Sequence, residues 1–366
     1  MTSLPTTTTA WRLQTRGSPA TELKLDKDVP IPELKPGQAL VAIEQAGINP
    51  VDWKIASVLP GIVQNLPRTM GSDFVGRVLS VKAPTASAPD DAFLPEVGQK
   101  VYGMVHAASF RGRQGSLCEH TVVPIEGLAP LPPNRLSSEQ AAGLGVVGLT
   151  AVRMESFAKK GDRVLLLGAS TGIGVLLAAM LKSPLVGVSH LVATASGQKI
   201  GELRERGHID EFVDYRKEKN VEDVLKERYA AASPAAFDVI LDCVGSSATQ
   251  MRCAEFLKKG GTYFNTGASS IEADNLFWSV IAFLKNAIQT NILPVWLGGA
   301  SGVIQGGPLL SRRQDWDRLN SFIEGGYLDP KTDSAFSYNE ASKAYERLMT
   351  GRAFGKVVVK VKEDVE

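Results

Sequence analysis

Residues 164–180 read VLLLGASTGIGVLLAAM, an apolar run followed by a glycine cluster and a second apolar run without proline. This order predicts a strand, a tight turn and a helix. Gly168, Gly172 and Gly174 would let the backbone turn sharply and approach a pyrophosphate, which the N–H groups at the start of the helix would face. The spacing G-x-x-x-G-x-G differs from the strict dinucleotide-binding fingerprint, so an ordinary strand–helix turn remains the alternative.

A second strand is predicted at residues 191–196, and its end indicates which dinucleotide is preferred. An NAD-preferring site places Asp or Glu there, to accept hydrogen bonds from the ribose 2′-hydroxyl. Here the strand ends at Ser196, no carboxylate follows, and Lys199 lies three residues further on. A hydroxyl and an ammonium favour a 2′-phosphate that a carboxylate would repel. We therefore predict NADPH as the cofactor, with a solvated surface charge as the alternative role of Lys199.

The composition excludes several classes of protein. The chain has 366 residues, of which 44% are hydrophobic and 22% charged, and its formal net charge is +1. This length suggests about two domains. A near-neutral charge argues against nucleic-acid binding and against electrostatic docking to a membrane. Three scattered cysteines, with no C-x-x-C pair, indicate a reducing compartment.

Strand patterns dominate the first third of the chain. Strands are predicted at residues 39–46, 74–81 and 100–105, and no long helical period occurs before about Ser137, so this part is mostly β. From Ser138 onward strands alternate with helices, which predicts an α/β region with a parallel sheet and crossover helices. The strand candidates of this region lie at residues 164–167, 191–195, 211–214, 237–242 and 261–264.

The end of the chain predicts one helix and one strand. We expect Asn339 to cap a helix with an apolar face that includes Tyr345 and Leu348, and Gly351 to stop it. Residues 356–361, KVVVKV, then predict a final strand.

Six motifs, in this order along the chain, carry a resemblance that covers nearly all of it. They are AGINPVDWK at 46–54, GSDFVG at 71–76, GLTA at 148–151, the glycine turn, VDYR at 213–216 and GKVVV at 355–359. The chain resembles the medium-chain dehydrogenase/reductase superfamily and is most similar to its zinc-free quinone oxidoreductase-like and enoyl reductase branch. The resemblance implies a GroES-like β domain at residues 1–135 and 299–366, a Rossmann domain at residues 136–298, and NADPH in the cleft between them. Since that family's first strand would begin at Trp11, we expect a cytoplasmic protein rather than a mitochondrial one.

The resemblance also bears on zinc. Zinc alcohol dehydrogenases place a cysteine where this chain has Asn49 and a histidine where it has Ser72, and neither replacement is a good zinc ligand. Cys118 and His120 form one close pair, which leaves at least one further ligand unaccounted for, so we expect them to be structural. We predict no metal.

Positions that match the family's functional residues define the expected site. Asn49 should lie beside the nicotinamide, followed on the same loop by Asp52 and by Lys54, a proton donor or substrate-orienting group. A turn asparagine before Pro50 and a solvated Lys54 are the alternatives. The expected cofactor contacts are Thr150, Gly168, Ala169, Ser170, Thr171, Gly172, Ile173, Gly174, Ser196, Lys199, Tyr215, Cys243, Val244, Gly267, Phe354 and Lys356.

Three hypotheses for the function follow. The first is an NADPH-dependent reductase of quinones or of the C=C bond of α,β-unsaturated carbonyl compounds, because without a metal a simple ketone is the harder acceptor. The second is a trans-acting enoyl reductase of a fungal polyketide pathway. The third is a non-enzymatic NADPH-binding scaffold, suggested by the apolar residues 276–299. That segment favours either a homodimer interface or pocket roof, or peripheral contact with a membrane or partner, and its polar interruptions exclude a transmembrane helix.

Overall fold

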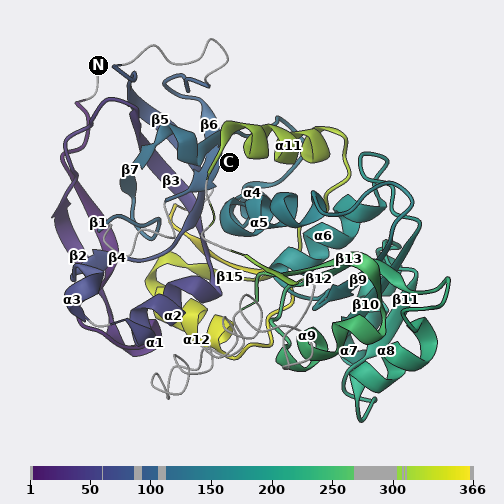
Figure 1. The fold of residues 1–366 in the computed structure, drawn as a ribbon. Helices are drawn as coiled ribbons and strands as arrows, with labels where there is room; N and C mark the ends of the chain where they lie inside the picture. Colours follow the sequence, from purple (N-terminus) through teal and green to yellow (C-terminus); the bar gives the residue numbers. More distant parts are fainter. Residues whose placement is uncertain are drawn as a thin grey trace. The chain divides into compact units, whose positions relative to one another are not determined.

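The structure is a computed structural model, in which residues 3–59, 61–85, 93–105, 113–267, 303–306, 309 and 311–362 are described. The chain divides into two compact units (Figure 1). Unit 1 comprises Met1–Leu149, Leu309–Gly326 and Pro330–Glu366, and unit 2 comprises Thr150–Pro308 and Tyr327–Asp329. Helix α4 (Ser138–Ala142) packs on strands of unit 1. The domain limits inferred from the resemblance, at residues 135 and 299, stay a prediction.

Unit 2 is built on a parallel six-stranded sheet with the order β11-β10-β9-β12-β13-β14 in the described residues. The chain enters at its centre with β9, runs outward to β11 and returns to β12, so the strand order reverses between β9 and β12. This is the doubly wound arrangement predicted for the α/β region. Its strands and helices are β9 (Arg163–Leu167), α6 (Gly172–Lys182), β10 (His190–Ala195), α7 (Gly197–Glu205), β11 (Glu211–Asp214), α8 (Val221–Tyr229), β12 (Phe237–Asp242), α9 (Ser247–Arg252), a 3-10 turn (Cys253–Glu255), β13 (Leu257–Asn265) and β14 (Val303–Gln305).

Unit 1 is mostly β, as predicted. Its larger sheet has the order β15-β16-β3-β5-β6-β8 with β7 paired to β3, and a smaller sheet has the order β2-β1-β4. The strands are β1 (Thr7–Leu13), β2 (Leu23–Pro30), β3 (Gln38–Ile48), β4 (Arg68–Thr69), β5 (Asp73–Lys82), β6 (Lys100–Met104), β7 (His120–Pro124), β8 (Leu128–Pro130), β15 (Thr332–Ser337) and β16 (Lys356–Lys360). The helices are α1 (Pro19–Glu22), α2 (Pro50–Val58), α3 (Gly61–Gln64), α4, α11 (Arg313–Glu324) and α12 (Ala341–Met349), with 3-10 turns at Ile125–Gly127 and Tyr338–Glu340. Helix α5 (Gly145–Glu155) belongs to unit 1 up to Leu149 and to unit 2 from Thr150.

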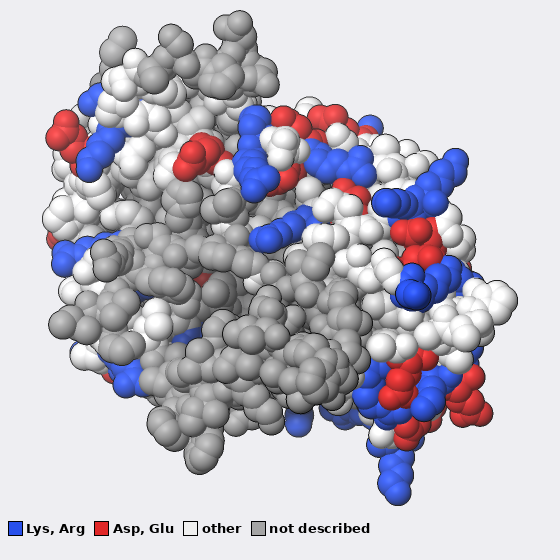
Figure 2. All heavy atoms as spheres, in the orientation of Figure 1, with Lys and Arg blue, Asp and Glu red and all other residues white. Residues whose placement is uncertain are grey.

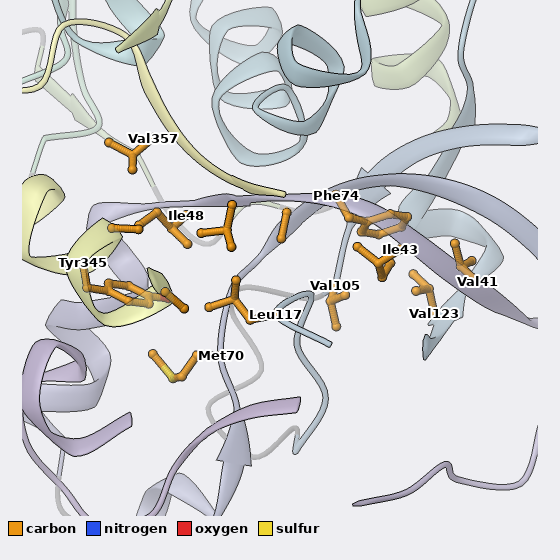
Figure 3. Packing of buried hydrophobic residues seen from close by; sticks show 14 of the residues in the cluster. Val41, Ile43, Ile48, Met70, Phe74, Val105, Leu117, Val123, Tyr345 and Val357 are labelled. Carbon is orange, nitrogen blue, oxygen red and sulfur yellow. The ribbon is translucent and has the colours of Figure 1, made fainter. Parts of the chain in front are cut away.

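The core of unit 1 joins both ends of the chain. Ile48 from β3, Val357 from β16 and Tyr345 from α12 are at most 1% exposed and belong to one apolar cluster, part of which Figure 3 shows. β16 pairs antiparallel with β3, so Val358 lies opposite Gly47. The C-terminal strand is therefore held beside the residues that lead into the expected catalytic motif.

Two local predictions were wrong. Asn49 does not precede an irregular loop: it is the N-cap of α2, because Pro50 fits the first helical position and Asp52 accepts a hydrogen bond from the Asn49 N–H at 2.9 Å. Asn339 does not cap α12 but lies inside the 3-10 turn before it, where Ser337 and Glu340 form the capping box. The predicted stop at Gly351 is confirmed by its φ of +65°.

The surface agrees with the balanced composition. On the face drawn in Figure 2, the described Lys and Arg side chains lie interspersed with Asp and Glu. Among the described residues, no helix is both long enough and apolar enough to cross a bilayer. The predicted apolar segment at residues 276–299 lies outside the described residues.

Candidate active site

The glycine turn of unit 2 has the geometry that a bound dinucleotide requires. Gly168 follows β9 with a φ of +83°, a conformation that favours glycine. Its N–H donates to Thr194 Oγ1 at 3.0 Å, and the Thr171 hydroxyl donates to the Gly168 carbonyl at 2.9 Å. A Cβ on Gly174 would lie 2.8 Å from Ala169 Cα and closer still to the Gly168 carbonyl oxygen. The first turn of α6 can therefore press against the loop only because residue 174 lacks a side chain.

The start of α6 has backbone donors that the helix itself does not use. Thr171 is the N-cap, and its Oγ1 accepts from the Gly174 N–H at 3.0 Å, while the Val175 N–H makes the first intrahelical bond to the Thr171 carbonyl at 3.0 Å. The N–H groups of Gly172 and Ile173 precede that bond and are available to an anion. This helix start follows β9, at the reversal of strand order where ligands bind in open α/β sheets. The residues present thus fit a dinucleotide pyrophosphate.

The ends of β10 and β11 form the expected 2′-phosphate region. Ser196 is the N-cap of α7, yet its hydroxyl makes no capping bond, Lys199 lies in the first turn of that helix, and Tyr215 is 48% exposed. Sequence reasoning gave no role to Asp214, which accepts the N–H groups of Gly197 and Arg216 at 3.0 and 3.1 Å. Asp214 therefore braces the two loops that carry the expected 2′-phosphate contacts.

The loop after β12 is organised by one buried carboxylate. Asp242 is fully buried and accepts the N–H groups of Val244, Gly245 and Ser246, each at 2.8 Å, together with the Tyr263 hydroxyl at 2.7 Å. These bonds hold Cys243 and Val244 next to the glycine turn, since a Cβ on Gly168 would lie 2.5 Å from Val244 Cγ2. Gly267 packs on the same loop so closely that a side chain there would overlap its backbone.

In unit 1, Asn49 lies at the centre of a buried polar cluster. Its Nδ2 donates to Asp73 Oδ2 at 2.9 Å, and its Oδ1 accepts from the Lys356 ammonium at 2.5 Å. The same ammonium donates to Asp73 Oδ2 and to the Ile48 carbonyl, both at 3.0 Å. The other Asp73 oxygen accepts the Val146 N–H at 2.7 Å. The cluster thus contains one ion pair and an amide whose two ends have different partners.

Asp52 lies beside this cluster. Its Oδ1 accepts from the Ser72 hydroxyl, and its Oδ2 accepts from the Asn49 N–H at 2.9 Å and from the Tyr345 hydroxyl at 3.4 Å. Burial raises the pKa of Asp52 to about 6, against the opposing effect of the hydrogen bonds from Ser72 and from the Asn49 N–H. Burial also raises the pKa of Asp73, and the Lys356 ammonium opposes that rise. With a pKa of about 6, Asp52 changes its protonation in mildly acidic solution.

Lys54 lies in the second turn of α2, with its ammonium 5.7 Å from the centroid of the Trp53 ring. Burial lowers the pKa of Lys54 below its usual value, so this ammonium releases its proton more readily than a solvated lysine would. That is the direction a proton donor needs.

The expected cofactor contacts divide between the units. Most of them follow the carboxyl ends of strands of unit 2: residues 168–174, Ser196, Tyr215, Cys243, Val244 and Gly267. Thr150 is a buried residue of α5. Phe354 and Lys356 belong to unit 1, where the Lys356 ammonium has three protein acceptors. Their contacts with a cofactor stay a prediction.

The positions that hold zinc ligands in zinc alcohol dehydrogenases are engaged otherwise here. Asn49 binds Asp73 and Lys356, and Ser72 binds Asp52. Within the described ranges, no group of three or more His, Cys, Asp or Glu side chains has the geometry to hold a metal ion.

Comparison with known proteins identifies the family. Residues 35–133 match the alcohol dehydrogenase GroES-like domain, and residues 208–359 match the zinc-binding dehydrogenase family. The chain is 30% identical over 378 residues to the trans-enoyl reductase pgmF of Aspergillus terreus, covering 100% of this chain and 99% of that protein. It is 31% identical over 366 residues to the NADPH-dependent alkenal/one oxidoreductase, chloroplastic, of Arabidopsis thaliana, covering 98% of this chain and 80% of that protein.

A solved structure shows the same fold. The quinone oxidoreductase of Coxiella burnetii superposes with a TM-score of 0.73 at 24% identity, over 97% of this chain and 99% of that one. The chain therefore belongs to the medium-chain dehydrogenase/reductase superfamily, in its zinc-free quinone oxidoreductase-like and enoyl reductase branch, and it is an oxidoreductase.

Proposed function

We propose that the protein is an NADPH-dependent reductase of α,β-unsaturated carbonyl compounds and quinones. The proposal is carried by the glycine turn, which packs against the start of α6. At the end of β10, Ser196 and Lys199 follow, and residues 195–201 include no Asp or Glu. The alkenal/one oxidoreductase relative is NADPH-dependent by name, which supports the same cofactor.

When bound, NADPH supplies a hydride from C4 of its nicotinamide. We assign to Gly172 and Ile173 the binding of the pyrophosphate, and to Ser196, Lys199 and Tyr215 the binding of the 2′-phosphate. Asn49 orients the nicotinamide or the acceptor through its amide. After hydride addition at the β-carbon of an enone, negative charge develops on the carbonyl oxygen and the α-carbon takes a proton. Lys54 is the group we assign to that oxygen or to that proton.

The first experiment measures NADPH and NADH oxidation spectrophotometrically with small enones, enals, quinones and enoyl thioesters. We expect turnover with NADPH and an enone or quinone. An enzyme that binds NADPH but turns over none of these acceptors would contradict the proposal.

Lys199→Ala tests the assigned cofactor preference. Losing a charge-assisted contact to the 2′-phosphate costs about 1.5 kcal/mol, so the KM for NADPH should rise about 10-fold while that for NADH stays unchanged. Lys226→Ala is the matched control, because it removes a lysine of α8 that pairs with Glu255 at 3.2 Å and has no assigned cofactor contact. Equal changes in both KM values for Lys199→Ala would refute the 2′-phosphate assignment.

Lys54→Ala tests the proton donor. General acid catalysis contributes about 100-fold, so kcat for an enone should fall by about that factor. Quinone reduction should lose much less, because its protons go to oxygens that exchange with water directly. Steady-state kcat with both acceptors and solvent isotope effects measure the difference. If both acceptors slow equally, Lys54 positions the substrate or cofactor and does not donate the proton.

A second candidate function is trans-acting reduction of carrier-bound enoyl chains. It is favoured by full-length similarity to proteins named trans-enoyl reductases, at 30% and 28% identity. Here the acceptor is an enoyl thioester on a carrier protein. A kcat/KM for a carrier-bound enoyl chain at least about 100-fold above that for its free thioester analogue would establish this function. Equal values would reject it.

We further propose that the protein is cytoplasmic and that it forms a homodimer through the apolar residues 276–299, with peripheral membrane contact as the competing use of that segment. Light scattering at micromolar concentration measures whether the protein is a homodimer, and flotation with phospholipid vesicles measures its membrane contact. A monomer that floats with vesicles would reverse the assignment.

A further inference from the structure

Lys356 is an almost fully buried cation. It is 7% exposed, and its partner Asp73 is fully buried. A lysine loses several kcal/mol of hydration on burial unless its donors are matched, and here the three ammonium donors meet Asp73 Oδ2, Asn49 Oδ1 and the Ile48 carbonyl. The side-chain stem is held as well, since a Cβ on Gly143 would lie 2.9 Å from Lys356 Cγ.

The two neighbours of the Asn49 amide determine its orientation. An ammonium can only donate, so it selects the carbonyl end of the amide, and a carboxylate can only accept, so it selects the NH₂ end. Reversing the amide would place Nδ2 against the ammonium and Oδ1 against Asp73, which is repulsive at both ends. Among the described residues, Asp73 is the acceptor for Nδ2, and it takes one of the two Nδ2 hydrogens.

We propose that Lys356 is a positioning residue that fixes the orientation of the Asn49 amide. In this orientation, the second Nδ2 hydrogen of Asn49 is the donor offered to the carbonyl oxygen of the substrate or to the nicotinamide carboxamide. This role rests on the proposed reductase function. It goes beyond that function because the orientation of the Asn49 donor is set by a residue 307 positions away in the sequence. The pair Lys356–Asp73 then supplies orientation without adding net charge, as the two groups neutralise each other.

A double-mutant cycle tests the proposal. Lys356→Met should lower kcat at least about 10-fold, in the range seen when residues that orient an active-site group are removed. In an Asn49→Ala background the same substitution should change kcat by less than about twofold, because the group it orients is gone. If Lys356→Met slows Asn49→Ala as much as it slows the wild type, Lys356 does not act through Asn49 and the proposal fails.

Two further variants keep the test valid if Lys356→Met folds poorly. Lys356→Met combined with Asp73→Asn leaves no unpaired buried charge and should still show the loss in kcat. Gly143→Ala pushes the Lys356 stem aside while its charge is kept, and its φ of −88° suits alanine. It should lower kcat about threefold or more. Lys343→Met, at an exposed pair with Glu340, is the control that should leave kcat unchanged.

A spectroscopic readout separates this inference from the proposed function. The side-chain NH₂ resonances of Asn49 should shift in Lys356→Met and not in Lys343→Met, whether or not a substrate is known. Unshifted Asn49 resonances would overturn the inference even if the wild type is an active reductase. A wild type inert toward every acceptor, with shifted resonances, would overturn the proposed function alone.

Discussion

Gly174→Ala is expected to weaken NADPH binding at least about 100-fold, which corresponds to about 2.7 kcal/mol. The added Cβ would overlap the Gly168 carbonyl oxygen and approach Ala169 Cα to 2.8 Å, and both are backbone atoms of the turn. Relieving the overlap requires the start of α6 and the loop to move apart, which displaces the N–H groups assigned to the pyrophosphate. Such overpacking also costs about 3 kcal/mol of stability. Calorimetric titration with NADPH and denaturant unfolding measure the two effects.

Gly201→Ala is the matched control for that substitution. Gly201 lies within α7, and apart from the backbone of its own helix no atom of the described residues lies within 4 Å of the added Cβ. Alanine there should therefore raise stability by about 0.5 to 1 kcal/mol and leave NADPH affinity intact. If Gly174→Ala behaves like Gly201→Ala, the turn does not hold the cofactor in the proposed way.

Asp52→Asn is expected to change how stability depends on pH. The folded state raises the pKa of Asp52 from 3.8 to about 6. Below pH 4 the carboxyl is protonated in both states. Between pH 4 and 6 the folded protein keeps a proton that the unfolded chain has lost, so this group's contribution to stability falls as pH rises. Above about pH 6 to 7 the penalty is constant, at about 3 kcal/mol.

The substitution removes that penalty with little change in shape. An asparagine amide can accept the Asn49 N–H, and the Tyr345 hydroxyl beside it, with its oxygen. Its nitrogen can donate to the Ser72 hydroxyl, so all three contacts of Asp52 have a counterpart. Relative to the wild type, Asp52→Asn should therefore gain stability as pH rises from 4 to 7, by about 2 to 3 kcal/mol. Urea unfolding of both proteins at several pH values measures the difference. A difference that stays constant from pH 4 to 8 would show that Asp52 titrates normally.

Local sequence patterns were sufficient to predict the cofactor unit. An apolar strand, a glycine turn and an uninterrupted apolar helix depend on neighbours in sequence, and β9 and α6 appear where residues 164–180 placed them. The same holds for β10, β11 and β12. Strand β13 begins at Leu257, before the predicted start at residue 261, and β14 was not predicted. The wrong N-cap at Asn339 shows the limit of this approach: two capping signals lay two residues apart, and Ser337 with Glu340 formed the better pair.

The buried polar cluster around Asn49 was only half predictable. Asn49-Pro50-Val51-Asp52 carries a capping-box pattern with proline at the first helical position, so α2 was available from sequence and was missed because helical periodicity over nine residues is weak. The roles of Asp73 and Lys356 were not available, because their contact joins residues 283 positions apart and depends on β16 pairing with β3. No local pattern distinguishes that buried lysine from a solvated one.

Hydride transfer without a metal is the central claim, and isotope transfer tests it most directly. NADPH carrying deuterium at the transferred position of C4 is consumed with a small enone, in buffer treated with a strong chelator, and the product is analysed by mass spectrometry and NMR. We expect one deuterium at the β-carbon of the saturated product, and a rate of NADPH oxidation that the chelator does not change. Product without deuterium, or activity lost on chelation and restored by zinc, would contradict it.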